Sequence, residues 1–273
     1  MPAPRATKLI AALSLAQLCL ACGAGSPLMH PARALPTGDV RAAIGMSADA
    51  IYGDGASRVR AGQDAAAAAP DGATAAQSQE FADGAVALAS LAPAVAPFVA
   101  ARVGVGQRFE AGLAYTGRAF RADVRRSFDS KHTSFSVGLA GSTVVLSGSN
   151  EQTLRGANFA GLRGYGVEAP VLLGWHSDAD VYWAWAGARV GYETVRVEPL
   201  SSEPRAASAD AITLVASRFY AGPVAGLAVG LRRLHVGFEL AGAFNAVNGR
   251  MGQRSGSFTA FSLTPATSLL WTF

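Results

Sequence analysis

Apolar and polar residues alternate with a period of two along most of the chain after residue 37. Between Tyr165 and Trp175, one set of alternate positions is apolar, whereas the other set includes glycines and Glu168. The stretch between Tyr182 and Tyr192 repeats this arrangement. A period of two is the signature of a β-strand, because successive side chains point to opposite faces of a sheet. The pattern therefore predicts strands that each have one apolar face.

The apolar face of both stretches begins and ends with an aromatic residue, and the two ends are ten positions apart. At roughly 3.3 Å per residue and a strand tilt of about 40°, this spacing projects to about 25 Å, the height of the lipid-facing band of a membrane barrel. In this register Ala186 faces lipid near the bilayer midplane. We predict an aromatic girdle formed by Tyr165, Trp175, Tyr182, Tyr192 and Phe219.

The same alternation predicts an all-β fold, an antiparallel up-and-down transmembrane β-barrel of about ten strands, with eight as the alternative. The strands are expected at about 38–52, 91–105, 107–116, 118–128, 133–146, 159–175, 180–197, 211–231, 233–246 and 257–273. Links after even-numbered strands are short, and those after odd-numbered strands are mostly long. Short periplasmic turns and long outer loops are typical of bacterial barrels. A closed sheet is also the only β-structure without unpaired edges in lipid.

Composition separates this barrel from a soluble β-sandwich, which also alternates. Charged residues make up 15% of the chain, whereas about a quarter is usual in soluble domains. Lys131 is the only lysine after the N-terminal segment, although exposed sandwich faces would carry many. The basic residues are scattered and form no stripe interleaved with aromatics, so nucleic acid is not an expected partner.

The N-terminus has the pattern of an export signal. Arg5 and Lys8 precede the apolar run LIAALSLAQLCLA, which has signal-peptide length. The following CLAC resembles a bacterial lipobox, although Cys19 replaces the usual leucine three places before Cys22. We predict that Cys22 is lipidated; the alternative is an ordinary cleaved signal. The expected organisation is a signal peptide at 1–22, a periplasmic linker at 23–37, and a barrel at 38–273 with a long, mobile outer loop at 53–90.

Alternation continues to the last residue of the chain, through Leu269, Trp271 and Phe273. With Phe261 and Leu263 before them, these residues resemble the terminal strand of Gram-negative outer-membrane β-barrel proteins. The resemblance implies a location in the cell outer membrane and recognition of the last strand by the barrel assembly machinery. It also implies contact with outer-membrane lipids and lipopolysaccharide.

The inward face of the predicted strands carries charges of both signs. Mixed charges in a narrow barrel predict a salt-bridged core, because barrels of eight to ten strands are mostly filled by side chains. The alternative is a thin passage with a weak preference for anions. The expected lumenal charges are Arg102, Arg108, Glu110, Arg121, Asp123, Glu168, Arg189, Glu193, Arg218 and Glu239, together with Arg41, Asp49 and Arg125.

One short motif has the residue types of a hydrolase, the stretch HSDAD from His176 to Asp180. Adjacent turn residues cannot face one another as a catalytic triad, and Asp and Ser are common in turns. The chain shares its strand number with the omptin proteases, but its outer loops contain no histidine. No metal-ligand spacing or cofactor motif is present. We therefore expect no enzyme activity, cofactor or metal.

These patterns favour an outer-membrane barrel with a structural, adhesive or ligand-binding role, whose ligand is unknown. A narrow pore or transporter for small solutes is the alternative. A barrel enzyme of the protease or lipase type is the least favoured interpretation.

Overall fold

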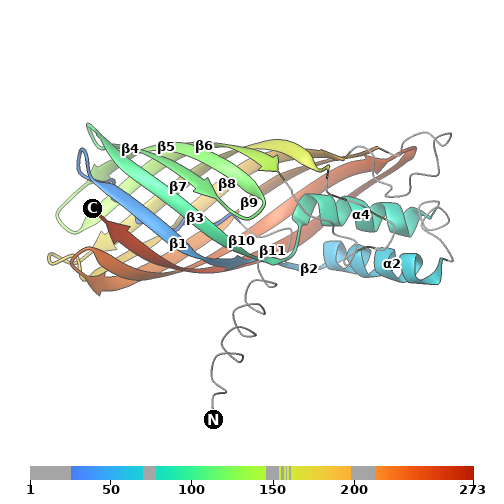
Figure 1. Ribbon diagram of the computed structural model, residues 1–273, viewed down its shortest axis with the longest axis horizontal. Helices are drawn as coiled ribbons and strands as arrows, with labels where there is room; N and C mark the ends of the chain where they lie inside the picture. The colour runs from blue at the N-terminus through green and yellow to red at the C-terminus, as the bar shows by residue number, and fades with distance from the viewer. Residues whose placement is uncertain are drawn as a thin grey trace, which may run out of the picture.

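The structure, a computed structural model, describes residues 26–69, 78–145, 154, 157, 159, 161–197 and 213–273. The predicted signal peptide and Cys22 lie outside these residues. The described strands form one antiparallel sheet that closes on itself, because the first strand pairs with the last. The predicted antiparallel barrel is thereby confirmed (Figure 1).

Ten antiparallel strands make the barrel wall, because β1 and β2 are two parts of one strand, interrupted at Asp49, and both pair with β11. The elements are β1 Val40–Ala48, β2 Ala50–Tyr52, α2 Asp54–Ala68, α4 Gln79–Leu91, β3 Val95–Gly106, β4 Phe109–Tyr115, β5 Ala119–Asp129, β6 Thr133–Val145, β7 Arg163–His176, β8 Tyr182–Val197, β9 Leu214–Leu231, β10 Leu234–Met251 and β11 Arg254–Thr272. Neither of the two described helices is long and apolar enough to cross a membrane.

The outward face of the barrel is apolar and carries the predicted aromatic residues. Each of the five girdle residues points outward, with 43–67% of its surface exposed: Tyr165, Trp175, Tyr182, Tyr192 and Phe219. Tyr192 and Phe219 are paired across β8 and β9, so they lie at the same level. An exposed apolar surface of this extent is explained by lipid rather than by water.

The β10–β11 hairpin is longer than the sequence pattern predicted. A loop was expected at 247–256, but the ladder continues to the pair Met251 and Arg254. The chain reverses at Gly252, which has a φ of 59°. These strand tips extend beyond the level of the outward-facing aromatic residues. There, Val247 and Phe258 are buried under helices instead of facing lipid. The lipid-type pattern therefore ends before the strands do.

Two helices occupy most of the segment 53–90, which was predicted to be a mobile loop. Helix α4 begins after Ser78, whose Oγ accepts a hydrogen bond of 3.0 Å from the N–H of Phe81. It ends at Ala92, which has a left-handed backbone conformation and whose N–H donates a hydrogen bond to the carbonyl of Leu88. Alanine is frequent in this segment, and it is the best helix former among the residues. The expectation is therefore wrong for the described residues of this segment.

The helices cover the end of the barrel opposite the C-terminus (Figure 1). Helix α4 packs on the tips of β8 to β11, and α2 packs on α4. Buried apolar side chains from the helices and from the strand tips form one cluster, which includes Phe81, Val86, Leu91, Leu214 and Met251. We call α2 and α4 the helical cap.

The N-terminal residues run inside the barrel, and this contradicts the predicted periplasmic linker for residues 26–37. Leu28, His30 and Leu35 are each no more than 5% exposed, and Ala32 is completely buried. The chain enters β1 from the end at which the C-terminus lies. We call residues 26–36 the lumenal segment. Its apolar residues follow no period of two or 3.6, so their pattern predicts no ordered element.

Candidate functional site in the barrel lumen

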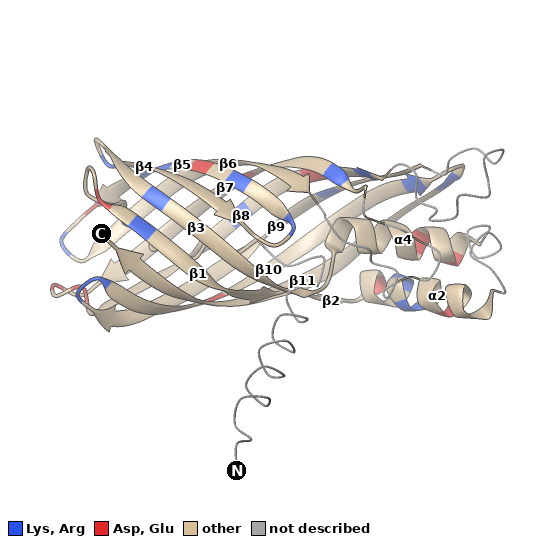
Figure 2. Ribbon diagram, viewed as in Figure 1, with Lys and Arg blue, Asp and Glu red and all other residues tan. Residues whose placement is uncertain are grey.

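The lumen contains nearly all of the charges that the sequence placed there. Figure 2 shows basic and acidic positions distributed along the strands as well as at the ends of the barrel. Arg108 is the exception, because it is exposed in the turn between β3 and β4. Gln107 and Arg108 both have positive φ values, of 51° and 64°, so the strand predicted to begin at residue 107 begins after this turn.

One part of the charge network is centred on Glu110, which is fully buried on β4. Its carboxylate pairs with Arg125 at 2.9 Å and with Arg102, and Arg102 also pairs with Asp123. Buried charges are stable only when they are paired and hydrogen-bonded. The alternating signs across neighbouring strands meet that condition here.

A second part of the network is centred on Glu168 of β7. Arg121 lies 2.9 Å from its carboxylate, Arg189 lies 3.5 Å away, and the hydroxyl of Tyr220 donates to it at 2.9 Å. These contacts join strands β5, β7, β8 and β9 across the lumen. The predicted salt-bridged core is therefore present.

A third part contains Arg118, which the sequence pattern did not assign to the lumen. Arg118 pairs with Glu193 at 2.6 Å, and Arg218 pairs with the same carboxylate at 3.3 Å. Strict alternation from Arg121 would have turned residue 118 outward. It follows Gly117, which has a φ of 78° in the β4–β5 turn, and the turn breaks the alternation.

Arg118 also connects the lumen to the helical cap, because it donates a 2.9 Å hydrogen bond to the carbonyl of Ala89 in α4. Burial lowers the pKa of Arg118 from its ordinary value, and the Glu193 carboxylate opposes this shift. The cap is thus held by a buried guanidinium as well as by apolar packing.

Glu239 binds the backbone of the lumenal segment. Its carboxylate accepts hydrogen bonds from the N–H groups of Leu28 at 2.6 Å and Met29 at 2.7 Å. A third hydrogen bond comes from the indole N–H of Trp185 at 3.0 Å. A charge-assisted bond of this kind is about twice as strong as a neutral one.

Other lumenal charges bind the remaining polar groups of the same segment. Arg125 donates to the carbonyls of Pro31 and Arg33, the latter at 3.2 Å. Arg189 donates to the carbonyl of Ser26, and Glu110 accepts from the N–H of Leu35 at 2.8 Å. An irregular buried segment needs such partners for its backbone groups. The charge network is therefore also the binding site of the lumenal segment.

Inward-facing glycines make room for this segment. A Cβ atom at Gly174 would lie 2.8 Å from the Cβ of Ala32, and one at Gly104 would lie 2.0 Å from the carbonyl oxygen of Pro36. The glycines on the polar side of the strands thus allow close approach of another backbone.

The HSDAD turn shows no catalytic arrangement. The hydroxyl oxygen of Ser177 accepts hydrogen bonds from the N–H groups of Val181 at 2.8 Å and Tyr182 at 3.3 Å, so it stabilises the turn. Asp180 accepts a hydrogen bond from the indole of Trp183. Within the described residues, no three His, Cys, Asp or Glu side chains come together as a metal site.

These features define the class of the protein. A closed antiparallel barrel with an apolar, aromatic-bounded outer face and a charged, filled lumen is the architecture of Gram-negative outer-membrane β-barrel proteins. The filled lumen agrees with the small strand number.

Comparison with known proteins gives structural similarities only. No protein-family model matches the chain, and no curated protein matches it. Ail, the attachment invasion locus protein of Yersinia pestis, aligns at 9% identity and a TM-score of 0.31 over 87% of this chain and 100% of its own. Neisserial surface protein A aligns at 8% identity and a TM-score of 0.34, over 86% and 96%. The CymD monoaromatic hydrocarbon channel aligns at 7% identity and 0.23, over 88% and 89%. The class therefore rests on the barrel's own geometry.

Proposed function

We propose that this protein is an integral outer-membrane barrel that does not conduct solutes and that presents its helical cap at the cell surface, in a structural, adhesive or ligand-binding role. The observation that supports a closed barrel is the lumenal segment, whose backbone is bound by Glu239, Arg125 and Arg189. The helical cap closes the opposite end through its apolar cluster.

The surroundings of the barrel are part of the same proposal. The exposed apolar wall suits outer-membrane lipids and lipopolysaccharide, and the terminal strand suits the barrel assembly machinery. At the cap, Arg58 pairs with both Asp54, at 3.1 Å, and Asp83, which supports a structural role for these three side chains.

Conductance in planar bilayers tests the closed barrel. We expect the purified, folded protein to give no channel steps, and a variant lacking residues 28–35 to give them, because the deletion removes the segment that fills the lumen. Arg60→Gln, an exposed position on α2, is the matched control and should remain silent. Regular channel steps from the unaltered protein would instead support the narrow pore.

A further inference from the structure

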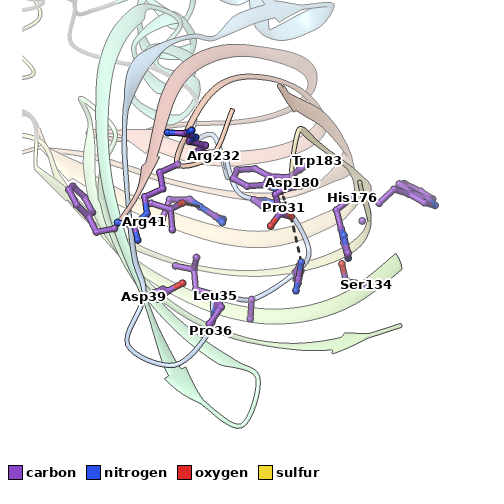
Figure 3. A pocket seen from close by; sticks show the side chains of 17 residues that line it. Pro31, Leu35, Pro36, Asp39, Arg41, Ser134, His176, Asp180, Trp183 and Arg232 are labelled. Atoms are coloured by element: carbon purple, nitrogen blue, oxygen red, sulfur yellow. Dashed lines mark hydrogen bonds and ion pairs between the residues drawn. The ribbon is translucent and has the colours of Figure 1, made fainter. Parts of the chain in front are cut away.

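A cavity of about 210 Å³ lies where the lumenal segment leaves the barrel. Its walls come from that segment, from β1, and from the β7–β8 and β9–β10 turns. Figure 3 shows Arg41, Arg232 and Asp39 on one side of it and His176 and Ser134 on the other. This end of the barrel also holds the C-terminal residue, Phe273.

Arg41 has unused hydrogen-bond donors at this cavity. Its side chain is buried, with 6% of the residue exposed, and its guanidinium lies 4.5 Å above the ring of Trp183. Only Nε has a protein partner among the described residues, the hydroxyl of Thr272 at 3.2 Å. Nη1 is buried without any partner. A buried donor that is left unpaired is costly, and five donors on one guanidinium call for an acceptor.

The rest of the lining favours a negatively charged acceptor. Arg33, Arg232 and Arg233 line the cavity with Arg41, whereas its acidic side chains are Asp39 and Asp180. Arg33 lies 3.6 Å from Asp180, so that aspartate is already engaged. With the terminal carboxylate of Phe273 counted, four arginines face three acidic groups, so the basic groups are in excess.

The two turn arginines also border the lipid-facing side. A second hollow is lined by Arg232 and Arg233 together with Leu231, Leu234 and Trp271. The leucines and the tryptophan are more than half exposed on the outer wall. A ligand with an anionic head at the cavity would thus have an apolar surface beside it.

We propose that this cavity is a binding site for a phosphate group, with Arg41 as its buried anchor and Arg232 and Arg233 as its outer contacts. Guanidinium groups bind phosphate with paired N–H donors, and a tetrahedral anion accepts from several directions at once. The phosphate could belong to a soluble monoester or to the headgroup of a bilayer lipid. The proposal does not depend on whether the barrel conducts.

Binding of inorganic phosphate to the full-length protein in detergent micelles, measured by isothermal titration calorimetry, tests the site. We expect saturable binding, and we expect Arg41→Gln to weaken it by about tenfold or more, since a charge-assisted bond is lost. Arg232→Gln, which changes an exposed turn residue, should weaken it to a smaller extent. Arg60→Gln on α2 is the control and should bind as the parent does.

The source of the phosphate is distinguished by repeating the titration in nanodiscs. With phosphatidylglycerol in the disc, a headgroup site is already occupied and added phosphate should no longer bind. With a phosphate-free lipid matrix, binding should persist. If phosphate binds equally in both, the ligand is soluble. The proposal is overturned if the parent shows no saturable binding, or if both Arg41→Gln and Arg232→Gln bind as tightly as the parent.

Discussion

The absence of a side chain at Gly174 makes room for the lumenal segment. Gly174 faces inward on β7, and its nearest neighbours from elsewhere in the chain are atoms of Ala32 and Ser134. Gly141, on β6, has nothing within 4 Å of the place where a Cβ would stand. A larger side chain at residue 174 would therefore collide with the lumenal segment, whereas one at residue 141 would meet no neighbour.

We expect Gly174→Val to displace the lumenal segment and to destabilise the barrel by about 1–3 kcal/mol, the usual cost of overpacking. Protease sensitivity of residues 26–36 and channel formation in bilayers would report the displacement. Gly141→Val should change neither property. A Gly174→Val protein that remains protected and silent would show that the segment does not need this glycine.

Substitutions at Ala186 test which face of β8 points toward lipid. It is paired with Leu173 and Ala225. The alternation of the strand places it on the face opposite to the inward-facing Trp185 and Arg189. We expect Ala186→Arg to cost about 2–4 kcal/mol in unfolding titrations in lipid vesicles, because a cation on the lipid face near the midplane is poorly solvated. Ala186→Leu should be nearly neutral. Equal stability of the arginine variant and the parent would contradict the register.

At the scale of elements, β11 closes the barrel with its last residues. The N–H of Phe273 donates to the carbonyl of Val40 at 2.8 Å, and its ring stacks on Trp271 with centroids 5.2 Å apart. Leu269, Trp271 and Phe273 are each at least half exposed on the outer face. Their side chains therefore lie on the outer surface of the barrel.

Deletion of Phe273 should lower the amount of folded protein in the outer membrane, because the terminal strand loses both its closing hydrogen bond and its final aromatic residue. Heat-modifiable gel migration of membrane fractions measures the folded amount. Conservative replacement by Tyr should retain most of it. Unchanged insertion after deletion would argue against an assembly signal at this end.

The helical cap depends on the apolar face of α4. Phe81 is 1% exposed in the cluster beneath the cap, whereas the neighbouring Glu80 is exposed. We expect Phe81→Ala to destabilise the cap by about 3–5 kcal/mol, the usual range for removing a buried phenylalanine. Limited proteolysis between β2 and β3 should then accelerate, whereas Glu80→Ala should behave as the parent does. Equal cleavage of both variants would show that the cap is held mainly by Arg118.

At the scale of the whole molecule, the lumenal segment limits how the N-terminus can be anchored. Ser26 is bound inside the closed wall by Arg189. Residues 22 to 26 span about 14 Å at most when extended, so an anchor on Cys22 has to lie within that distance of Ser26.

We therefore expect lipidation of Cys22 and a seated lumenal segment to exclude one another. Mass spectrometry of the folded, purified protein should show a mature chain without acyl mass that begins after Cys22. An acylated Cys22 would mean that residues 26–36 leave the lumen, and channel steps should then accompany the lipid.

The wall of this protein could be predicted from the alternation of apolar and polar residues alone. Strict alternation fixes which side chains face lipid, because a strand has only two faces and lipid tolerates only one kind of residue. The girdle from Tyr165 to Phe219 and most of the lumenal charges follow from that rule alone. Arg108 and Arg118 do not, since positive φ values in tight turns interrupt the alternation.

The filling of the lumen and the covering of the end under α2 and α4 depend on contacts between distant parts of the chain. The lumenal segment has no periodicity, because its backbone is paired with the side chains of Glu239 and Arg125 rather than with a neighbouring strand. The helical cap needed the extended tips of β8 to β11 as a surface on which to bury Phe81. Both features depend on contacts between residues far apart in the sequence, such as Met29 and Glu239, which are 210 positions apart. A pattern within a short stretch of sequence cannot reveal such contacts.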